Sequence, residues 1–172
     1  MSVGSLKEPT LLALRQLLSP RGYRKSSSLF SKQSQDVVHL IEVQGSLKST
    51  ATTPMFTVNI GVFAPELIYA DVRSTTKPSI PQAHWRTRLG ILSPERQDLW
   101  WSVTSDLQAR SAAQDISARV EHFALPVLER LQNLGSLVAL WESGSSPGIS
   151  EAQRKEFLLR WRHERGFNPS AA

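Results

Sequence analysis

The hydrophobic period of this chain changes near its middle, and that change limits the folds that the chain can adopt. In residues 56–63 and 84–92, apolar residues alternate with polar ones, which is the period of a β-strand. From about Thr104 onward they recur every three or four residues, which is the period of a helix packed on one side. Strands followed by helices are typical of an α+β fold with an antiparallel sheet, because βαβ units would interleave the two periods.

Four segments are predicted to be strands. Residues 23–32 precede a hairpin turn expected at residues 33–36, whose sequence is Gln-Ser-Gln-Asp. Residues 37–44 have apolar side chains on both faces, as expected of a buried strand. Residues 56–63 and 84–92 alternate, so each has one apolar and one polar face. We expect the helices to cover the apolar faces of these last two strands, formed by Phe56, Val58, Ile60, Val62, Trp85, Leu89 and Ile91.

Helical periodicity flanks the strands on both sides. An apolar stripe at residues 11–18 predicts a helix before them. After them, residues 116–127 form a second stripe, in which Pro126 is expected to kink or split the helix. A last helix of about residues 151–165 is expected to end at Gly166. The predicted order is therefore one helix, four strands and then helices.

The chain is predicted to be a single domain. Its 172 residues have the length of one domain, and the sequence contains no repeat and no internal boundary. We expect one α+β domain over residues 1–172, with residues 150–172 forming a C-terminal helix and a short tail. Its four-stranded antiparallel sheet would have one face packed by helices. Cysteine is absent, which excludes disulfides, thiolate metal ligands and a cysteine nucleophile.

Several segments together resemble a known family. Gly-Tyr-Arg-Lys at residues 22–25 follows a leucine-rich helix, and VVHLIEVQGS, FTVNIGVF, HWRTRLG and a Trp-Trp pair come after it. In this order they resemble the bacterial domain of unknown function numbered 4304, over roughly residues 11–134. The Pro-Val-Leu-Glu segment at residues 126–129 is similar to the family's later helix. The resemblance implies a bacterial origin and a fold, and no reaction, since the family has no established activity.

The polar face of the predicted sheet holds the candidate binding residues. Arg86 and Arg88 lie two positions apart on one strand, so they point to the same side and can together grip a phosphate, a carboxylate or an acidic protein. Side-chain amides on the neighbouring strands would add directional hydrogen bonds. The predicted binding residues are Gln44, Asn59, His84, Arg86 and Arg88. In the alternative interpretation Arg86 or Arg88 pairs with Glu42 across the sheet, and the face is simply solvated.

Positive charge is concentrated in the first half of the chain. Residues 1–90 hold 11 Lys and Arg against 5 Asp and Glu, whereas residues 91–172 hold 9 against 10. The net charge of +5 therefore consists of +6 in the strand-rich half and −1 in the helical half. A basic sheet region can attract an acidic protein surface or a nucleic acid.

Three functions follow from these features. The leading prediction is a protein-binding or regulatory module, for example one that neutralises a toxin, whose partner presents an acidic surface. A nucleic-acid-binding domain is the alternative, although basic and aromatic residues are not interleaved as in ribonucleoprotein motifs. The third is an enzyme on a small anionic substrate, in which the arginine pair holds the substrate and His84 or Glu42 acts as acid or base.

The sequence contains no motif of a particular reaction and no recognisable targeting signal. The chain lacks GxSxG, GxxxxGK[ST], GxGxxG and HExxH, and its four histidines are far apart in sequence, so we expect no cofactor, no metal and no catalytic residue. The N-terminal residues carry no apolar segment behind basic residues, so no secretory signal is expected. The apolar stretches are too short to cross a bilayer. A cytoplasmic protein without membrane contact is therefore predicted.

Overall fold

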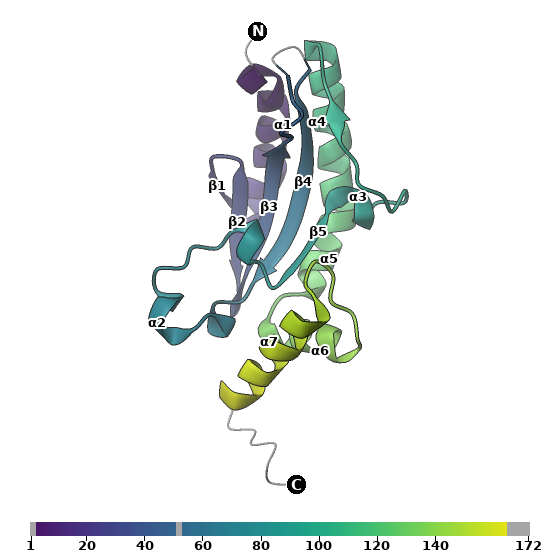
Figure 1. Cartoon of the computed structure of the whole chain (residues 1–172). Coiled ribbons are helices and arrows are strands. Elements are labelled where there is room, and N and C mark those ends of the chain that lie inside the picture. Colours follow the sequence, from purple (N-terminus) through teal and green to yellow (C-terminus); the bar gives the residue numbers. More distant parts are fainter. Residues whose placement is uncertain (1–2, 51–52, 165–172) are drawn as a thin grey trace.

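The computed structural model describes residues 3–50 and 53–164, which form an antiparallel sheet packed against helices (Figure 1). The strands are β1 (Arg24–Ser26), β2 (Leu29–Ser34), β3 (Val37–Gly45), β4 (Met55–Phe63), β5 (Trp85–Arg88) and β6 (Trp101–Ser102). They lie in the order β1-β2-β3-β4-β5, and β6 pairs with β4. β4 pairs with three strands, because β3 lies along one of its edges while β5 and β6 share the other.

The helices lie behind the sheet and at one end of it. They are α1 (Val3–Leu18), α2 (Ala70–Arg73), α3 (Leu89–Leu92), α4 (Asp106–Arg119), α5 (Leu125–Arg130), α6 (Leu134–Glu142) and α7 (Glu151–Glu164). α1 and α4 run side by side along the back of the sheet, whereas α6 and α7 form a pair at its lower end in Figure 1. α7 confirms the predicted last helix, but its expected end at Gly166 and the tail to residue 172 lie outside the described residues.

The face of the sheet that α1 and α4 cover forms the main hydrophobic core. Phe56, Val58, Ile60 and Val62 alternate along β4, and all four are buried in this core. Burial of each such side chain contributes about 1.5–3 kcal/mol to stability. The alternation of β4 therefore predicted correctly which of its faces the helices cover.

The sheet has more strands than the four that were predicted. Residues 23–32 contain two strands, because a tight turn with a positive φ of 54° at Ser27 separates β1 from β2. β6 has two residues, which is too few to carry a period. The hairpin turn expected at residues 33–36 is confirmed, although β2 continues to Ser34 and the turn itself is tighter.

The predicted strand at residues 84–92 is a strand only over β5, and α3 follows it directly. A close approach explains the change. A Cβ on Gly90 would lie 2.7 Å from Leu99 Cγ, so the chain can pass this point only with glycine. The backbone coils into α3 instead of extending the strand. Ile91, which the alternation placed under the helices, is consequently 46% exposed, whereas Leu89 is buried as expected.

The kink predicted at Pro126 is a π-helical turn, Val120–Ala124, between α4 and α5. Pro126 is the second residue of α5 and has no N–H, so it cannot donate the usual helical bond to His122. The preceding residue, Leu125, donates its N–H to the Val120 carbonyl, five residues back, which is the π-helical bond. The proline therefore does not end the helix but is accommodated by one wider turn.

The second face of the sheet is partly covered, although the sequence predicted it to be open. Val38, Leu40 and Phe63 form a small second core there, under the segment that links β4 to β5. This linking segment, residues 64–84, contains α2 and contributes Ile80 to the same cluster. The face is open only further along β3 and β4, and this open part holds most of the predicted binding residues.

Replacing Asn133 by alanine is expected to lower the free energy of unfolding by about 1 kcal/mol. Asn133 caps α6: its side chain accepts a hydrogen bond from the Ser136 N–H at 2.8 Å, and the Ser136 hydroxyl accepts from the Asn133 N–H at 3.4 Å. Asn133→Asp keeps the capping oxygen and loses only the exposed bond from Nδ2 to Gln35 Oε1, so it should be clearly more stable than the alanine variant in urea unfolding. Equal losses in the two variants would contradict a capping role.

Candidate functional site

An open groove of about 510 Å³ lies on the uncovered part of the second sheet face. Strands β3, β4 and β5 form its floor, and residues from the linking segment, α3 and the loop after α6 form its sides. Its lining residues are Gln44, Asn59, Ile80, Pro81, Arg86, Thr87, Arg88, Ile91 and Gly148. Four of the five predicted binding residues therefore line one groove, and His84 does not.

Asn59 and Gln44 form an amide pair on the floor of the groove. Asn59 is directly opposite Glu42 on β3 and Arg88 on β5, and it is 6% exposed. Its Nδ2 donates to Gln44 Oε1 at 2.7 Å and more weakly to Glu42 Oε2 at 3.4 Å. Among the described residues, Asn59 Oδ1 and the Gln44 NH₂ group have no hydrogen-bond partner, so the pair can still accept and donate one bond each.

Arg88 forms an ion pair with Asp98, which lies in the loop after α3. Its guanidinium group is 5.1 Å from the centre of the Trp100 ring, and Trp100 Nε1 donates to Asp98 Oδ2 at 3.1 Å. Burial raises the pKa of Asp98, but the hydrogen bonds from Arg88 and Trp100 outweigh it and lower this pKa below its usual value. Arg88 therefore pairs with Asp98 and not with Glu42, which was the partner expected in the alternative interpretation.

Arg86 holds two loops against β5. Its Nε donates to the Gly148 carbonyl at 2.8 Å and one terminal nitrogen donates to the Pro81 carbonyl at 2.5 Å. Its backbone N–H donates to the Pro147 carbonyl at 3.3 Å. Arg86 and Arg88 thus bind different segments and do not converge as the fork that their spacing suggested.

His84 lies outside the groove, immediately before β5, and is 2% exposed. Its Nδ1 accepts a hydrogen bond from the Ala64 N–H at 3.1 Å, and its ring packs against Phe63 and Phe157. Burial, with a smaller contribution from the charge of Arg160, lowers the pKa of His84 to about 4. His84 is therefore a neutral part of the packed interior between the linking segment and α7.

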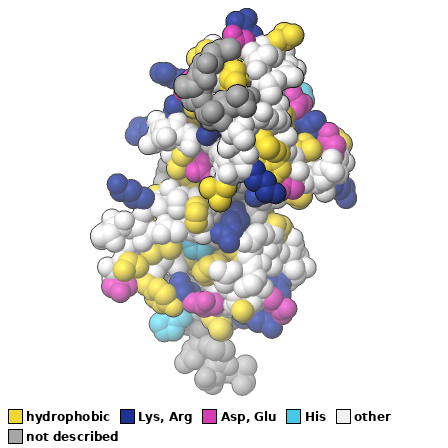
Figure 2. Space-filling model, turned by 45° about the horizontal axis from the view of Figure 1, so that its top comes forward, with side chains coloured by type: hydrophobic (Ala, Val, Ile, Leu, Met, Phe, Trp, Pro, Cys, Tyr) yellow, Lys and Arg dark blue, Asp and Glu magenta, His cyan; other side chains and the backbone are white. Residues whose placement is uncertain are grey.

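The charges on this side of the molecule are mixed in sign. Figure 2 shows Lys and Arg side chains interspersed with Asp and Glu, without one continuous basic area. Ion pairs in the described part of the chain include that of Arg160 with Glu156 and that of Arg119 with Glu95. In the described ranges, no group of three or more His, Asp or Glu side chains is placed to hold a metal ion. None of the helices there combines the length and apolar character that crossing a bilayer requires.

One family model matches the chain. It is described as "Domain of unknown function (DUF4304)", and it matches residues 14–130, which is more than half of the sequence. The chain belongs to this family. The match confirms the resemblance found in the ordered segments and has nearly the same limits. No curated protein and no solved structure matches the chain.

The DUF4304 match contains every residue that lines the groove except Gly148. α6 and α7 follow the end of the match. The two carbonyl groups of Pro147 and Gly148 that Arg86 binds, and the Phe157 ring against His84, therefore come from the chain beyond the matched segment. This C-terminal part is attached to the DUF4304 segment by polar as well as apolar contacts.

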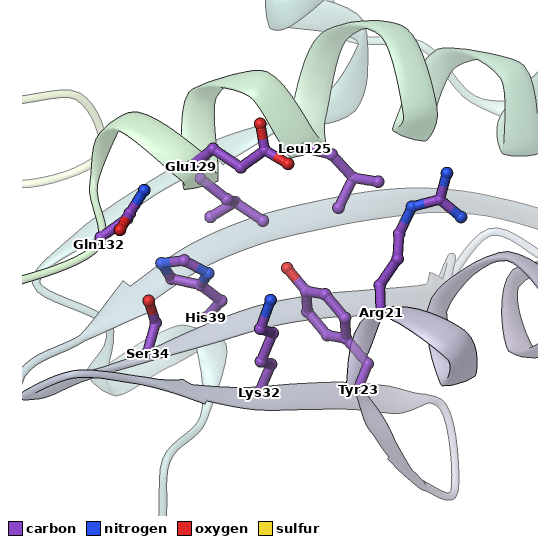
Figure 3. Close-up of a pocket in the computed structure, with 9 residues that line it drawn as sticks. Arg21, Tyr23, Lys32, Ser34, His39, Leu125, Glu129 and Gln132 are labelled. Carbon is purple, nitrogen blue, oxygen red and sulfur yellow. The ribbon is translucent and has the colours of Figure 1, made fainter.

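A second pocket, also almost wholly within the DUF4304 segment, was not predicted from the sequence. It has a volume of about 300 Å³ and lies between the β2–β3 hairpin and α5 (Figure 3). Tyr23, Lys32, His39 and Glu129 contribute its ionisable groups, together with Arg21. One signal was present in the sequence, since His39 interrupts an otherwise apolar strand face. The opposite wall of the pocket could not be predicted from local sequence patterns, because it contains Glu129, which is far from His39 along the chain.

Proposed function

We propose that this DUF4304 chain is a bacterial cytoplasmic protein-binding module that holds an extended segment of its partner in the groove along β5. One observation carries the proposal. Within the described ranges, Asn59 Oδ1 is an acceptor without a donor and the Gln44 NH₂ group is a donor without an acceptor, and both belong to the amide pair on the groove floor. This combination complements the N–H and C=O of a peptide unit.

The sides of the groove support the same proposal. Ile91 and Pro81 present exposed apolar surface in the lining of the groove, where side chains of a bound segment would pack. Arg86 binds carbonyl oxygens and is paired with no carboxylate in the described part of the chain, so its charge is not neutralised. A partner segment with acidic residues would therefore be preferred. Such binding could serve to regulate or neutralise the partner.

The two other functions considered above have less support. Nucleic-acid binding requires a continuous positive surface, whereas positive and negative side chains alternate over the face in Figure 2. An enzyme that held a small anion here would require Arg86 and Arg88 to converge, and each is engaged with a different segment.

A random peptide library displayed on phage tests the proposal when it is selected on the full chain. We expect the recovered peptides to contain Asp or Glu, and to shift the side-chain NH₂ signals of Asn59 and Gln44 in ¹⁵N NMR spectra. The variant Ile91→Asp places a charge in the groove wall and should weaken these peptides roughly tenfold or more.

Leu107→Asp is the matched control, because Leu107 is also an exposed apolar residue but lies at the start of α4, outside the groove. It should bind the peptides as the unmodified chain does. A library that yields no binder, or peptides that bind Ile91→Asp unchanged, would exclude the groove as a docking site. A shift of short single-stranded DNA or RNA at low salt would favour the nucleic-acid alternative instead.

A further inference from the structure

The pocket under α5 interrupts the main core with polar side chains. Lys32 on β2 is directly opposite His39 on β3, and both lie on the sheet face that the helices cover. Two positions away on that face, the pair Phe30 and Ile41 is fully buried in the apolar core. Polar groups in such a position destabilise the fold unless they find partners. His39 is buried and Lys32 is half-buried, so the bonds that each still has free determine what the pocket can hold.

His39 has one nitrogen committed to the protein and one available. Its Nε2 is 2.9 Å from the Leu131 carbonyl oxygen, which can only accept, so Nε2 carries the proton and donates. Burial lowers the pKa of His39, and the charge of Lys32 lowers it further, although the bond to Leu131 and the charge of Glu129 oppose this. The ring is therefore neutral at pH 7, and Nδ1 is a hydrogen-bond acceptor. In Figure 3 this nitrogen is turned toward the interior of the pocket.

Tyr23 and Lys32 supply donors to the same space. Tyr23 is 5% exposed, and its hydroxyl has no hydrogen-bond partner among the described residues, although it points toward α5 in Figure 3. Burial, with the nearby charge of Glu129, raises the pKa of Tyr23, so its hydroxyl keeps its proton. The Lys32 ammonium lies 5.7 Å from the centre of the Tyr23 ring. It makes no ion pair within the described ranges.

Lys32 and Glu129 line this pocket from opposite walls and do not reach each other. Lys32 comes from the sheet and Glu129 from α5, and no ion pair joins them. The other basic residue, Arg21, is already paired with Glu121 at 2.6 Å. Among the described residues, neither Lys32 nor Glu129 has an ion-pair partner, so the pocket presents one positive and one negative charge that are not paired there.

We propose that this pocket binds a small zwitterion of the α-amino acid type. The ligand carboxylate would accept hydrogen bonds from Lys32 and the Tyr23 hydroxyl, and its ammonium group would donate to Glu129 and His39 Nδ1. A simple anion would meet Glu129 and a simple cation would meet Lys32, so a ligand with both charges is favoured over either. The volume of about 300 Å³ is at the lower end of the range for small-molecule sites, which suits a ligand of this size.

Calorimetric titration of the full chain with each of the common L-amino acids tests the inference. At least one of them should bind saturably. Its N-acetyl derivative and its carboxamide each lack one charge, and each should bind roughly tenfold more weakly or worse. Acetate, inorganic phosphate and methylammonium each carry charge of one sign only and should not compete.

Two variants locate the ligand. Lys32→Met and Glu129→Gln should each weaken binding roughly tenfold. Lys77→Met and Glu66→Gln make the same changes on the exposed linking segment and should leave it unchanged. Far-ultraviolet circular dichroism establishes that each variant is folded. Absence of binding by every amino acid, or equal binding of the N-acetyl derivative, would overturn the proposal. Ile91→Asp should bind the amino acid normally, so failure of the groove proposal is distinguishable from failure of this one.

Discussion

Lowering the pH from 6.5 to 4 is expected to reduce the free energy of unfolding by about 3 kcal/mol through His84 alone. His84 has an ordinary pKa of 6.5 when the chain is unfolded and a pKa of about 4 in the folded protein. Between these values the unfolded chain binds a proton that the native protein does not, so stability falls as the pH decreases. The full effect is reached below about pH 4, and none of it is present well above pH 6.5.

Urea unfolding at a series of pH values measures this effect when the chain is compared with His84→Asn. The Asn Oδ1 can take the place of Nδ1 as acceptor for the Ala64 N–H, and it does not titrate between pH 4 and 6.5. The variant loses ring contacts with Phe63 and Phe157, which lowers its stability by a constant amount. The difference between the two proteins should therefore shrink as the pH falls. A difference that is independent of pH would show that His84 titrates normally in the native state.

Gly148→Ala is expected to lower the free energy of unfolding by about 2–5 kcal/mol, the sum of two costs. Gly148 has a φ of +78°, which side-chain-bearing residues rarely adopt. A Cβ at this position would also overlap the carbonyl oxygen and Cγ of Arg86. The loop after α6 would have to separate from β5, and the bonds that Arg86 makes to Pro147 and Gly148 would be lost with it.

Gly144→Ala is the matched control for this variant. Gly144 lies in the same loop with a φ of +89°, but a Cβ there would approach nothing closer than Arg154 Nη1 at 3.8 Å. Only the backbone cost of about 1–2 kcal/mol should therefore be seen. Thermal or urea unfolding of both variants gives the comparison. Equal losses at the two glycines would mean that the contact with Arg86 contributes little to stability.

Local patterns predicted the long strands well and their ends poorly. β3 and β4 pair over nearly their whole length, and the pattern of each is visible in the sequence: β4 alternates, whereas β3 has apolar residues on both faces. The end of β5 depends on the approach of Gly90 to Leu99, which no periodicity of residues 84–92 contains. At the start of that strand, His84 lies one residue before the pairing begins and packs against Phe63 and Phe157. Its cover by α7 is a tertiary contact, which the alternation of a single strand does not contain.

The candidate groove was partly predictable for the same reason. Gln44 and Asn59 lie on one face of two adjacent strands, and alternation alone brings them together. The partners of Arg86 and Arg88 were not predictable, because Gly148 and Asp98 lie in loops whose positions depend on the whole fold. The pocket under α5 was missed because its two walls are joined only by tertiary packing.

The π-helical turn between α4 and α5 determines which side chains of α5 face the sheet. Successive residues of an α-helix advance by about 100° around its axis, and the wider turn at Val120–Ala124 changes that advance at one place only. The side chains of α5 are thereby rotated about the axis relative to those of α4, which lets Leu125 and Glu129 overhang the β2–β3 hairpin. An uninterrupted helix of the same length would turn a different set of side chains toward Tyr23 and His39. The residues that α5 contributes to the pocket are thus determined by the rotation of α5 about its axis, and not by the length of the helix.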